Sequence, residues 1–205
     1  MKYLILSICY VFIFCSAFAQ TENEKAIEEI LEFRRGLDKD YQDPKESPLG
    51  EKNVASFTGH RFFPIDLGLR VWAKAEVLKN EKSFLMKTSG TKTPEYKKYL
   101  KLIFSIDDST YVLYAYQNVV YSQKEEYKDY LFLPFTDKTN GFETYGGGRY
   151  IDIRIPTTDS LLLDFNQCYN PYCAYTTGYN CPIPPKENAL PIKIEVGILA
   201  PDSKF

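Results

Sequence analysis

Apolar and polar residues alternate along much of the second third of the chain. The alternation is clearest in segments 71–77, 84–86 and 100–106. A period of two is typical of β-strands that bury one face of a sheet. Segment 111–116 is almost entirely apolar or aromatic, which favours a strand covered on both faces. The pattern also predicts strands at 131–135, 151–155, 161–165 and 192–198.

A helical pattern occurs near the N-terminus. Thr21 and Glu24 form a capping box, and the apolar stripe that follows predicts a helix from about Glu22 to Gly36. No second helical stripe separates the strands, which argues against βαβ units. We therefore predict a mainly β fold, an antiparallel meander of about eight to ten strands curled into a barrel or sandwich, with one N-terminal helix.

The first 19 residues have the features of a secretory signal peptide. Lys2 precedes an uncharged apolar run, and Ala17-Phe18-Ala19 forms a small-x-small cleavage site before Gln20. Lipid attachment at Cys15 is the alternative, but bulky Phe14 precedes it. We expect an exported protein, periplasmic or secreted, with one β-rich domain over 20–205 and no stable membrane span after signal cleavage.

Composition excludes some functions. The net charge is −2, so the chain lacks the basic surface typical of nucleic-acid binding. Its 17 Tyr and 14 Phe suit half-buried strand faces, where a ring packs and a hydroxyl stays wet. With a single histidine, His60, no mechanism that needs two is possible.

After signal cleavage three cysteines remain, Cys168, Cys173 and Cys181. They allow at most one internal disulfide, and a Cys173–Cys181 bond would close a short loop. A zinc site of three cysteines and His60 and a catalytic thiol with His60 as base are alternatives, although the cysteine spacings are loose for zinc. No cofactor is predicted.

Two polar segments are candidates for a binding site. In the first, Asn140-Gly141 predicts a turn. Asp137, Thr139 and Glu143 of this turn bind a cation, or its Asp and Thr cap backbone groups. Gly146–Gly148 opens a strand and not a helix, so it does not form a phosphate loop. We expect its glycines to permit a close approach to the backbone, with Arg149 either paired with a carboxylate or facing an anion.

In the second segment, Asp164 and Asn166 share one strand face, as caps or as part of a pocket. Pro182, Pro184 and Pro185 predict an extended strap.

Three motifs together, PFTDKTNGFETYGGGRY (134–150), DFNQCYNPYCAY (164–175) and CPIPPKENALP (181–191), resemble an uncharacterised bacterial family, a domain of unknown function (DUF 1684). The resemblance covers essentially the whole mature chain but brings no activity. Cys168 departs from the family pattern, so the resemblance implies that Cys173 and Cys181 are paired. The residues that match the family motif are Asp137, Thr139, Gly141, Glu143, Thr144, Tyr145, Gly148, Arg149, Tyr150, Asp164, Asn166, Tyr169, Asn170, Cys173, Cys181, Pro182, Pro185 and Asn188.

Three functions fit these observations. The first is a binding module for a small polar or anionic molecule, in a pocket under the proline strap. The second is a hydrolase that uses two of the carboxylates as acid and base, and the third is a structural envelope protein. The predicted ligand-binding residues are Asp137, Glu143, Tyr145, Arg149, Tyr150, Asp164, Asn166, Tyr169 and Asn170.

Overall fold

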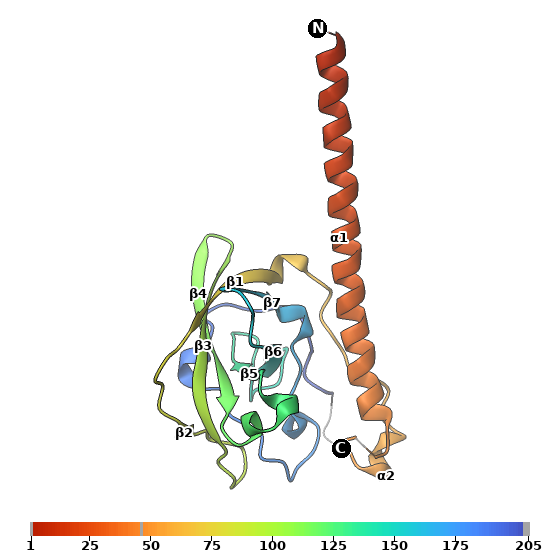
Figure 1. Ribbon diagram of the computed structural model, residues 1–205. Coiled ribbons are helices and arrows are strands. Elements are labelled where there is room, and N and C mark those ends of the chain that lie inside the picture. Colours follow the sequence, from red (N-terminus) through yellow and green to blue (C-terminus); the bar gives the residue numbers. More distant parts are fainter. Residues whose placement is uncertain (1, 46, 203–205) are drawn as a thin grey trace.

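A curled antiparallel sheet forms the centre of the protein (Figure 1). The computed structural model describes residues 2–45 and 47–202, with side chains from residue 21 onward. The sheet has seven strands in the order β6-β5-β4-β3-β1-β7, and β2 pairs with β3. The strands are β1 (Arg70–Val77), β2 (Phe84–Leu85), β3 (Glu95–Ile106), β4 (Ser109–Asn118), β5 (Tyr130–Phe135), β6 (Arg149–Arg154) and β7 (Ser160–Asp164). The half-barrel with its N-terminal helix confirms the predicted fold class.

The inner face of the sheet carries the largest core. The period of two places alternate side chains of each strand on this face, as predicted for β1 and β3. The C-terminal segment packs against it through Leu190, Ile194 and Val196. The buried core residues on the strands are Ala73, Ala75, Leu100, Leu102, Phe104, Leu113, Ala115, Leu131, Leu133, Phe135, Ile151, Ile153 and Leu163.

The prediction of a strand at 192–198 is wrong. Within this segment only Ile198 pairs, in an isolated bridge with Phe62. The described residues therefore form seven strands, fewer than the eight to ten expected. The apolar residues of this segment fill the curled sheet without joining it, and sequence alternation does not distinguish the two arrangements.

The opposite face of the sheet carries a second buried layer, which we call the tyrosine layer. It consists of Met86, Tyr96, Tyr116, Phe132 and Tyr150. Because Leu113 and Ala115 of β4 lie in the main core while Tyr116 lies in this layer, β4 is buried on both faces. The prediction for segment 111–116 is thus confirmed.

The remaining elements are helical. Helix α1 spans Lys2–Gln42, so it continues beyond the predicted end at Gly36. Its stripe includes Leu37 and Tyr41, which pack in a further cluster with Phe57 and Tyr175. The others are short: α2 (Glu51–Val54), η1 (Leu67–Leu69), η2 (Tyr121–Gln123), η3 (Glu125–Tyr127), η4 (Phe165–Gln167), η5 (Tyr172–Ala174) and η6 (Lys186–Asn188).

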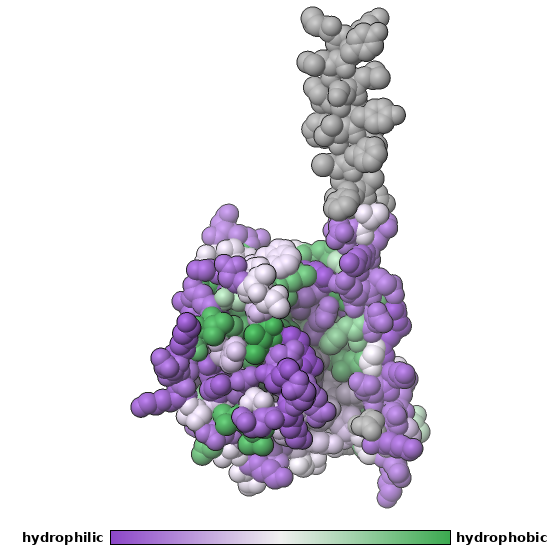
Figure 2. Space-filling view, viewed as in Figure 1, coloured by the Kyte–Doolittle hydropathy of each residue, from purple (hydrophilic) through white to green (hydrophobic). Residues whose placement is uncertain are grey.

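The predictions about the signal peptide and Cys15 fall on residues whose side chains lie outside the described range. In the part of the chain that is described, no helix has the length and apolar character needed to cross a membrane. Polar residues cover most of the surface in Figure 2, with smaller hydrophobic areas between them.

Charged side chains attach α1 to the rest of the protein. Arg34 stacks its guanidinium 4.5 Å from the ring centre of Phe62 and donates to the carbonyl of Phe63 at 3.1 Å. Arg70 of β1 pairs with Glu29 of α1 at 2.5 Å. These contacts place the helix beside the end of the sheet where β7 lies.

His60 is also part of this attachment. Its Nδ1 lies 2.6 Å from Oδ1 of Asp38 on α1, and its side chain is 1% exposed. Tyr41 and Tyr175 pack edge-on against the imidazole ring. Burial lowers the pKa of His60, although the bond to Asp38 and its charge act in the opposite direction. The imidazole is thus neutral, with the proton on Nδ1, and Nε2 is a buried acceptor without a partner among the described residues.

This arrangement predicts a loss of stability in mild acid. A lowered pKa in the folded state means that the unfolded chain takes up a proton first as the pH falls below about 6.5. The stability contributed by neutral His60 is complete above that pH and is lost as the pH falls through the folded pKa. We expect the free energy of unfolding, measured with urea at pH 7.5 and 5.5, to fall more for the wild type than for His60→Gln. An equal fall in both proteins would contradict the assignment.

Candidate ligand-binding site

Arg149, the first residue of β6, lies inside the protein and pairs with Asp137. Its Nη2 is 2.6 Å from Oδ2 of Asp137, and both side chains are 0% exposed. The guanidinium also donates to the carbonyls of Val196 at 2.6 Å and Ile194 at 2.8 Å. Asp137 accepts bonds from the amide and hydroxyl of Thr139. The pair is a closed cluster, so Arg149 is not available to an anionic ligand.

Gly148, beside Arg149, confirms the prediction of a close backbone approach. Its φ is +90°, and a Cβ there would lie 2.6 Å from the carbonyl oxygen of Phe135 and 2.7 Å from Cγ of Pro184. Only glycine avoids both clashes. The proline strap thus lies against the start of β6.

We expect removal of the Arg149 charge to destabilise the protein strongly. Arg149→Met leaves Asp137 buried without a cation and removes donors from two carbonyls, which should cost about 3–5 kcal/mol. Urea unfolding measures this change. The double variant Arg149→Met/Asp137→Leu should recover part of the loss, because it removes the unpaired charge. A single variant as stable as the wild type would show that the pair does not hold the C-terminal segment.

Asp164 and Asn166 form a separate structural cluster at the end of β7. Asp164 pairs with Arg70 at 2.9 Å and accepts the amide N–H of Asn166 at 2.9 Å. The Asn166 side chain accepts from the backbone N–H of Asp66 at 3.0 Å and donates to its carbonyl at 2.9 Å. This is the capping role considered for both residues, since their bonds go to protein groups.

Glu143 and Tyr145 belong to neither the Arg149 cluster nor the Asp164 cluster. Glu143 pairs with Lys193 at the surface at 2.6 Å. Tyr145 packs, partly buried, against the cluster beneath α1. With Asp137 on Arg149 and Asp164 on Arg70, each carboxylate predicted for the site has a cation of its own.

Tyr150, Tyr169 and Asn170 do come together, in a cavity that we call the tyrosine pocket. Its volume is about 430 Å³, and it lies over the tyrosine layer. Tyr150 and Tyr169 meet edge to face with ring centres 5.8 Å apart. The lining residues are Tyr96, Tyr121, Tyr130, Phe132, Tyr150, Tyr169, Asn170, Pro171, Tyr172, Tyr179, Asn180, Cys181 and Pro182.

A second cavity of about 380 Å³, the helix pocket, adjoins the tyrosine pocket beside α1. The two share Tyr169 and Tyr172 as lining residues. The helix pocket is lined by Phe33, Gly36, Leu37, Asp40, Tyr41, Pro48, Asp152, Tyr169 and Tyr172.

Asp152 lies where the two pockets adjoin. Its Oδ1 accepts hydroxyl bonds from Tyr130 at 2.6 Å and Tyr169 at 2.7 Å, both of which line the tyrosine pocket. Surrounding protein displaces water and raises the pKa of the Asp152 carboxyl, while the two tyrosine bonds act in the opposite direction. The residue as a whole stays exposed to solvent. It is therefore a carboxylate within reach of a bound molecule.

Asn170 supplies a second acceptor. Its Nδ2 donates to the hydroxyl of Tyr175 at 3.1 Å and to the carbonyl of Leu199 at 2.8 Å, which fixes the orientation of the amide. The residue is 2% exposed. Its Oδ1 is buried and has no partner among the described residues. A buried carbonyl oxygen of this kind needs a donor.

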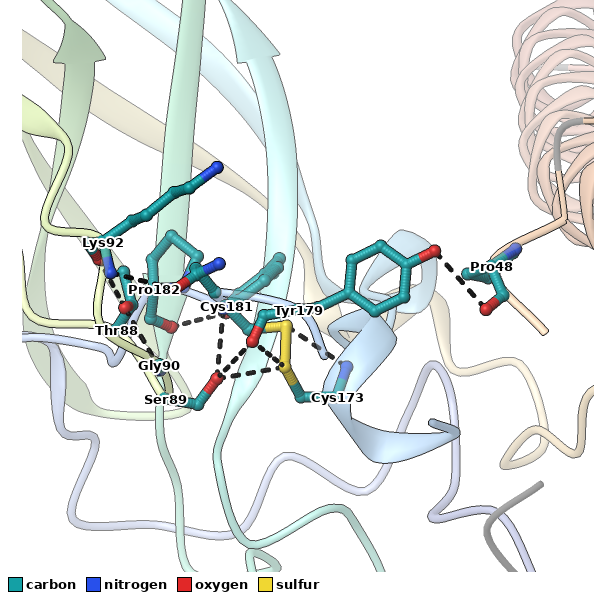
Figure 3. Close-up of a disulfide and its surroundings, with 11 residues drawn as sticks. Pro48, Thr88, Ser89, Gly90, Lys92, Cys173, Tyr179, Cys181 and Pro182 are labelled. Carbon is teal, nitrogen blue, oxygen red and sulfur yellow. Dashed lines mark hydrogen bonds between the residues drawn. A yellow bond between two sulfur atoms is a disulfide. The ribbon is translucent and has the colours of Figure 1, made fainter. Parts of the chain in front are cut away.

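A disulfide joins Cys173 and Cys181 at the edge of the tyrosine pocket, as predicted (Figure 3). The two Cα atoms are 6.2 Å apart. Backbone bonds also hold the strap to the sheet, since Ser89 donates to the carbonyl of Cys181 at 2.9 Å and Ile183 donates to that of Lys87 at 2.8 Å. The disulfide extends this attachment to the turn that carries Tyr172.

Loss of the disulfide should loosen that turn before it affects the sheet. Cys181 keeps its bonds to Ser89, whereas Cys173 loses its covalent link. We expect Cys173→Ser/Cys181→Ser to lower stability by about 2–3 kcal/mol. Amide exchange should accelerate at Ala174, Tyr175 and Thr176 with little change in β3 and β4. Uniform acceleration across the sheet would contradict this prediction.

The sequence did not identify Asp152 or Tyr130. Strand pairing contains the missing signal, since Asp152 lies opposite Phe132 and Tyr130 opposite Arg154 on antiparallel strands. Residues at such diagonal positions share a face and can contact each other through long side chains. Without the register, Asp152 is one polar residue of an alternating strand.

The alternative chemistries find no support in the geometry. Two of the three cysteines are in the disulfide, and burial raises the pKa of the remaining Cys168 thiol. Within the described ranges, no three His, Cys, Asp or Glu side chains are placed to hold a metal ion.

Comparisons with known proteins agree with the resemblance in sequence. Residues 55–198 match the family described as "Protein of unknown function (DUF1684)". The solution NMR structure of an uncharacterized protein from Haloarcula marismortui is similar, with 30% sequence identity and a TM-score of 0.67. The similarity covers 87% of this chain and 96% of that one. No curated protein matches the chain.

Proposed function

Because the chain belongs to the family of proteins of unknown function DUF1684, which has no assigned activity, we propose from the geometry that the domain binds a small polar molecule in the tyrosine pocket. One observation carries the proposal: Oδ1 of Asn170 is a buried acceptor without a partner among the described residues, and Asn170 lines the pocket. Leaving a buried acceptor unpaired costs about 1–3 kcal/mol. A ligand N–H or O–H donor that reaches this oxygen would remove the cost.

The walls of the pocket suit recognition of such a molecule. Aromatic faces give apolar contact, and a few placed polar groups fix orientation. Burial raises the pKa of Tyr150 and of Tyr169, so both hydroxyls keep their protons at neutral pH. Tyr150 donates to the carbonyl of Pro182 and Tyr169 to Asp152.

The proposed site is narrower than the one predicted from sequence. It keeps Tyr150, Tyr169 and Asn170, while the other predicted residues lie in the three structural clusters described above. We no longer propose an anionic ligand, because that prediction required an accessible Arg149, and the Arg149 side chain is 0% exposed.

Binding is favoured over hydrolysis for a related reason. The hydrolase hypothesis required two free carboxylates among Asp137, Glu143 and Asp164, and each of them is held by a cation. None of the three lines the tyrosine pocket or the helix pocket, so no two of them face a substrate there. Asp137 and Arg149 therefore have a structural role, separate from the proposed binding pocket.

We propose in addition that the protein is exported as a single domain over 20–205, after cleavage behind Ala19. The signal-peptide features of the first 19 residues support this proposal. The disulfide supports it too, because such bonds persist mainly in oxidising compartments.

Native mass spectrometry of the exported protein from its own host tests both proposals. We expect the mass of residues 20–205 plus a bound molecule that is released on denaturation. Tyr172→Ala should lose that molecule, because Tyr172 is a wall of both pockets. Tyr127→Ala is the control, since Tyr127 has similar exposure, 38% against 44%, and does not line either pocket. A wild type without any adduct, or equal adducts in both variants, would refute binding in this pocket. A mass that includes residues 15–19 or lipid on Cys15 would refute cleavage after Ala19.

A further inference from the structure

We infer that the bound molecule is an amine whose ammonium group binds Asp152 where the tyrosine and helix pockets adjoin. This inference rests on the proposed function and assigns a chemical class to its ligand. It commits to a primary or secondary amine, which combines positive charge with N–H donors.

The charge around the two pockets favours a cation. None of the residues that line either pocket is Lys or Arg. Asp40 and Asp152 both line the helix pocket, and neither has an ion-pair partner among the described residues. The carboxylates of the structural clusters, by contrast, each have a cation. A ligand ammonium would supply the missing counter-charge in a partly desolvated place, where charge pairs are stronger than in water.

Arg154 is the nearest basic residue on the same face of β6, and its bonds go elsewhere. Its guanidinium donates to Asp129 at 2.8 Å and to the carbonyl of Glu126 at 3.2 Å. It also lies 5.7 Å from the ring centre of Tyr130. It lowers the pKa of the Asp152 carboxyl less than the two tyrosine bonds do. Asp152 therefore has a cation nearby but none bonded to it.

The hydrogen-bonding groups favour a ligand that donates. Tyr130 and Tyr169 both direct their hydroxyls at Oδ1 of Asp152, which uses these donors and leaves Oδ2 without a protein partner in the described region. Oδ1 of Asn170 is a further acceptor. Tyrosine rings around the cavity offer faces to a cation, which adds a cation–π contribution. Acceptors and ring faces together match an ammonium group better than a hydroxyl or a carboxylate.

Three probes with the same five-carbon chain test the charge directly: 1,5-diaminopentane, pentane-1,5-diol and glutarate. Each is titrated into the exported protein, freed of its carried ligand, and binding is followed by NMR shifts of Tyr side chains. We expect the diamine to bind at least tenfold more tightly than the diol and glutarate not to bind measurably. Asp152→Asn should weaken the diamine at least tenfold and leave the diol unchanged, because an amide keeps the acceptor for the tyrosines and removes the charge.

Asp108→Asn is the matched control. It makes the same change of charge at the exposed turn between β3 and β4. This turn follows the last residue of β3, whereas Tyr96, which lines the tyrosine pocket, lies at the start of that strand. It should leave binding of all three probes unchanged.

The outcomes separate the inference from the proposed function. Diol or glutarate binding as tight as diamine binding would overturn the amine class and leave a ligand site in place. Diamine binding that Asp152→Asn does not weaken would overturn the role of Asp152. Absence of binding by every probe would overturn the amine class as well. If the native protein then also carries no molecule, the proposed function fails with it.

Discussion

The architecture depends on the buried bond network of Arg149. The C-terminal segment that fills the half-barrel is not a strand, so the sheet ladder does not satisfy its backbone carbonyls, and buried backbone groups need partners. Arg149 donates to two of them, Ile194 and Val196, while Asp137 balances its charge. One guanidinium thus fixes the first residue of β6 and the segment that closes the core.

Closing the inner face in this way leaves the other face of the same strands free for a second layer. Strand alternation directs Leu131 and Leu133 of β5 into the core and Phe132 into the tyrosine layer. A layer built from tyrosines carries hydroxyls at its outer edge, and these need bonds as well. The hydroxyls of Tyr130 and Tyr169, which pack against this layer, meet at Asp152. The hydroxyl of Tyr150 bonds to the carbonyl of Pro182, so the ordinary requirement to satisfy hydroxyls assembles the polar part of the pocket.

The sequence predicted the sheet and the two-sided burial of β4, because these follow from local periodicity. The pairing of the disulfide was implied by the resemblance to the family. It did not predict the path of 192–198, since the same apolar residues suit a strand or a plug. Of the residues predicted to bind a ligand, Tyr150, Tyr169 and Asn170 line the pocket that we propose as the site, and they lie within motifs that stand out by composition. Asp152 and Tyr130 require strand register, and the separation of Asp164 from Arg149 requires the three-dimensional fold. Motif residues that are close in sequence therefore have different structural roles.

Recognition explains the groups of the pocket better than catalysis does. Acid–base catalysis requires a group whose pKa lies near the working pH and another that exchanges a proton with it. Burial raises the pKa of Tyr130, Tyr150 and Tyr169 further from neutrality, so these hydroxyls remain donors. Asn170 does not titrate. Cys168, the free thiol of the described residues, is buried and does not line the pocket. What remains is one carboxylate with fixed tyrosine donors and an unpaired amide oxygen, a set of acceptors that suits the donor-rich molecule we propose as ligand.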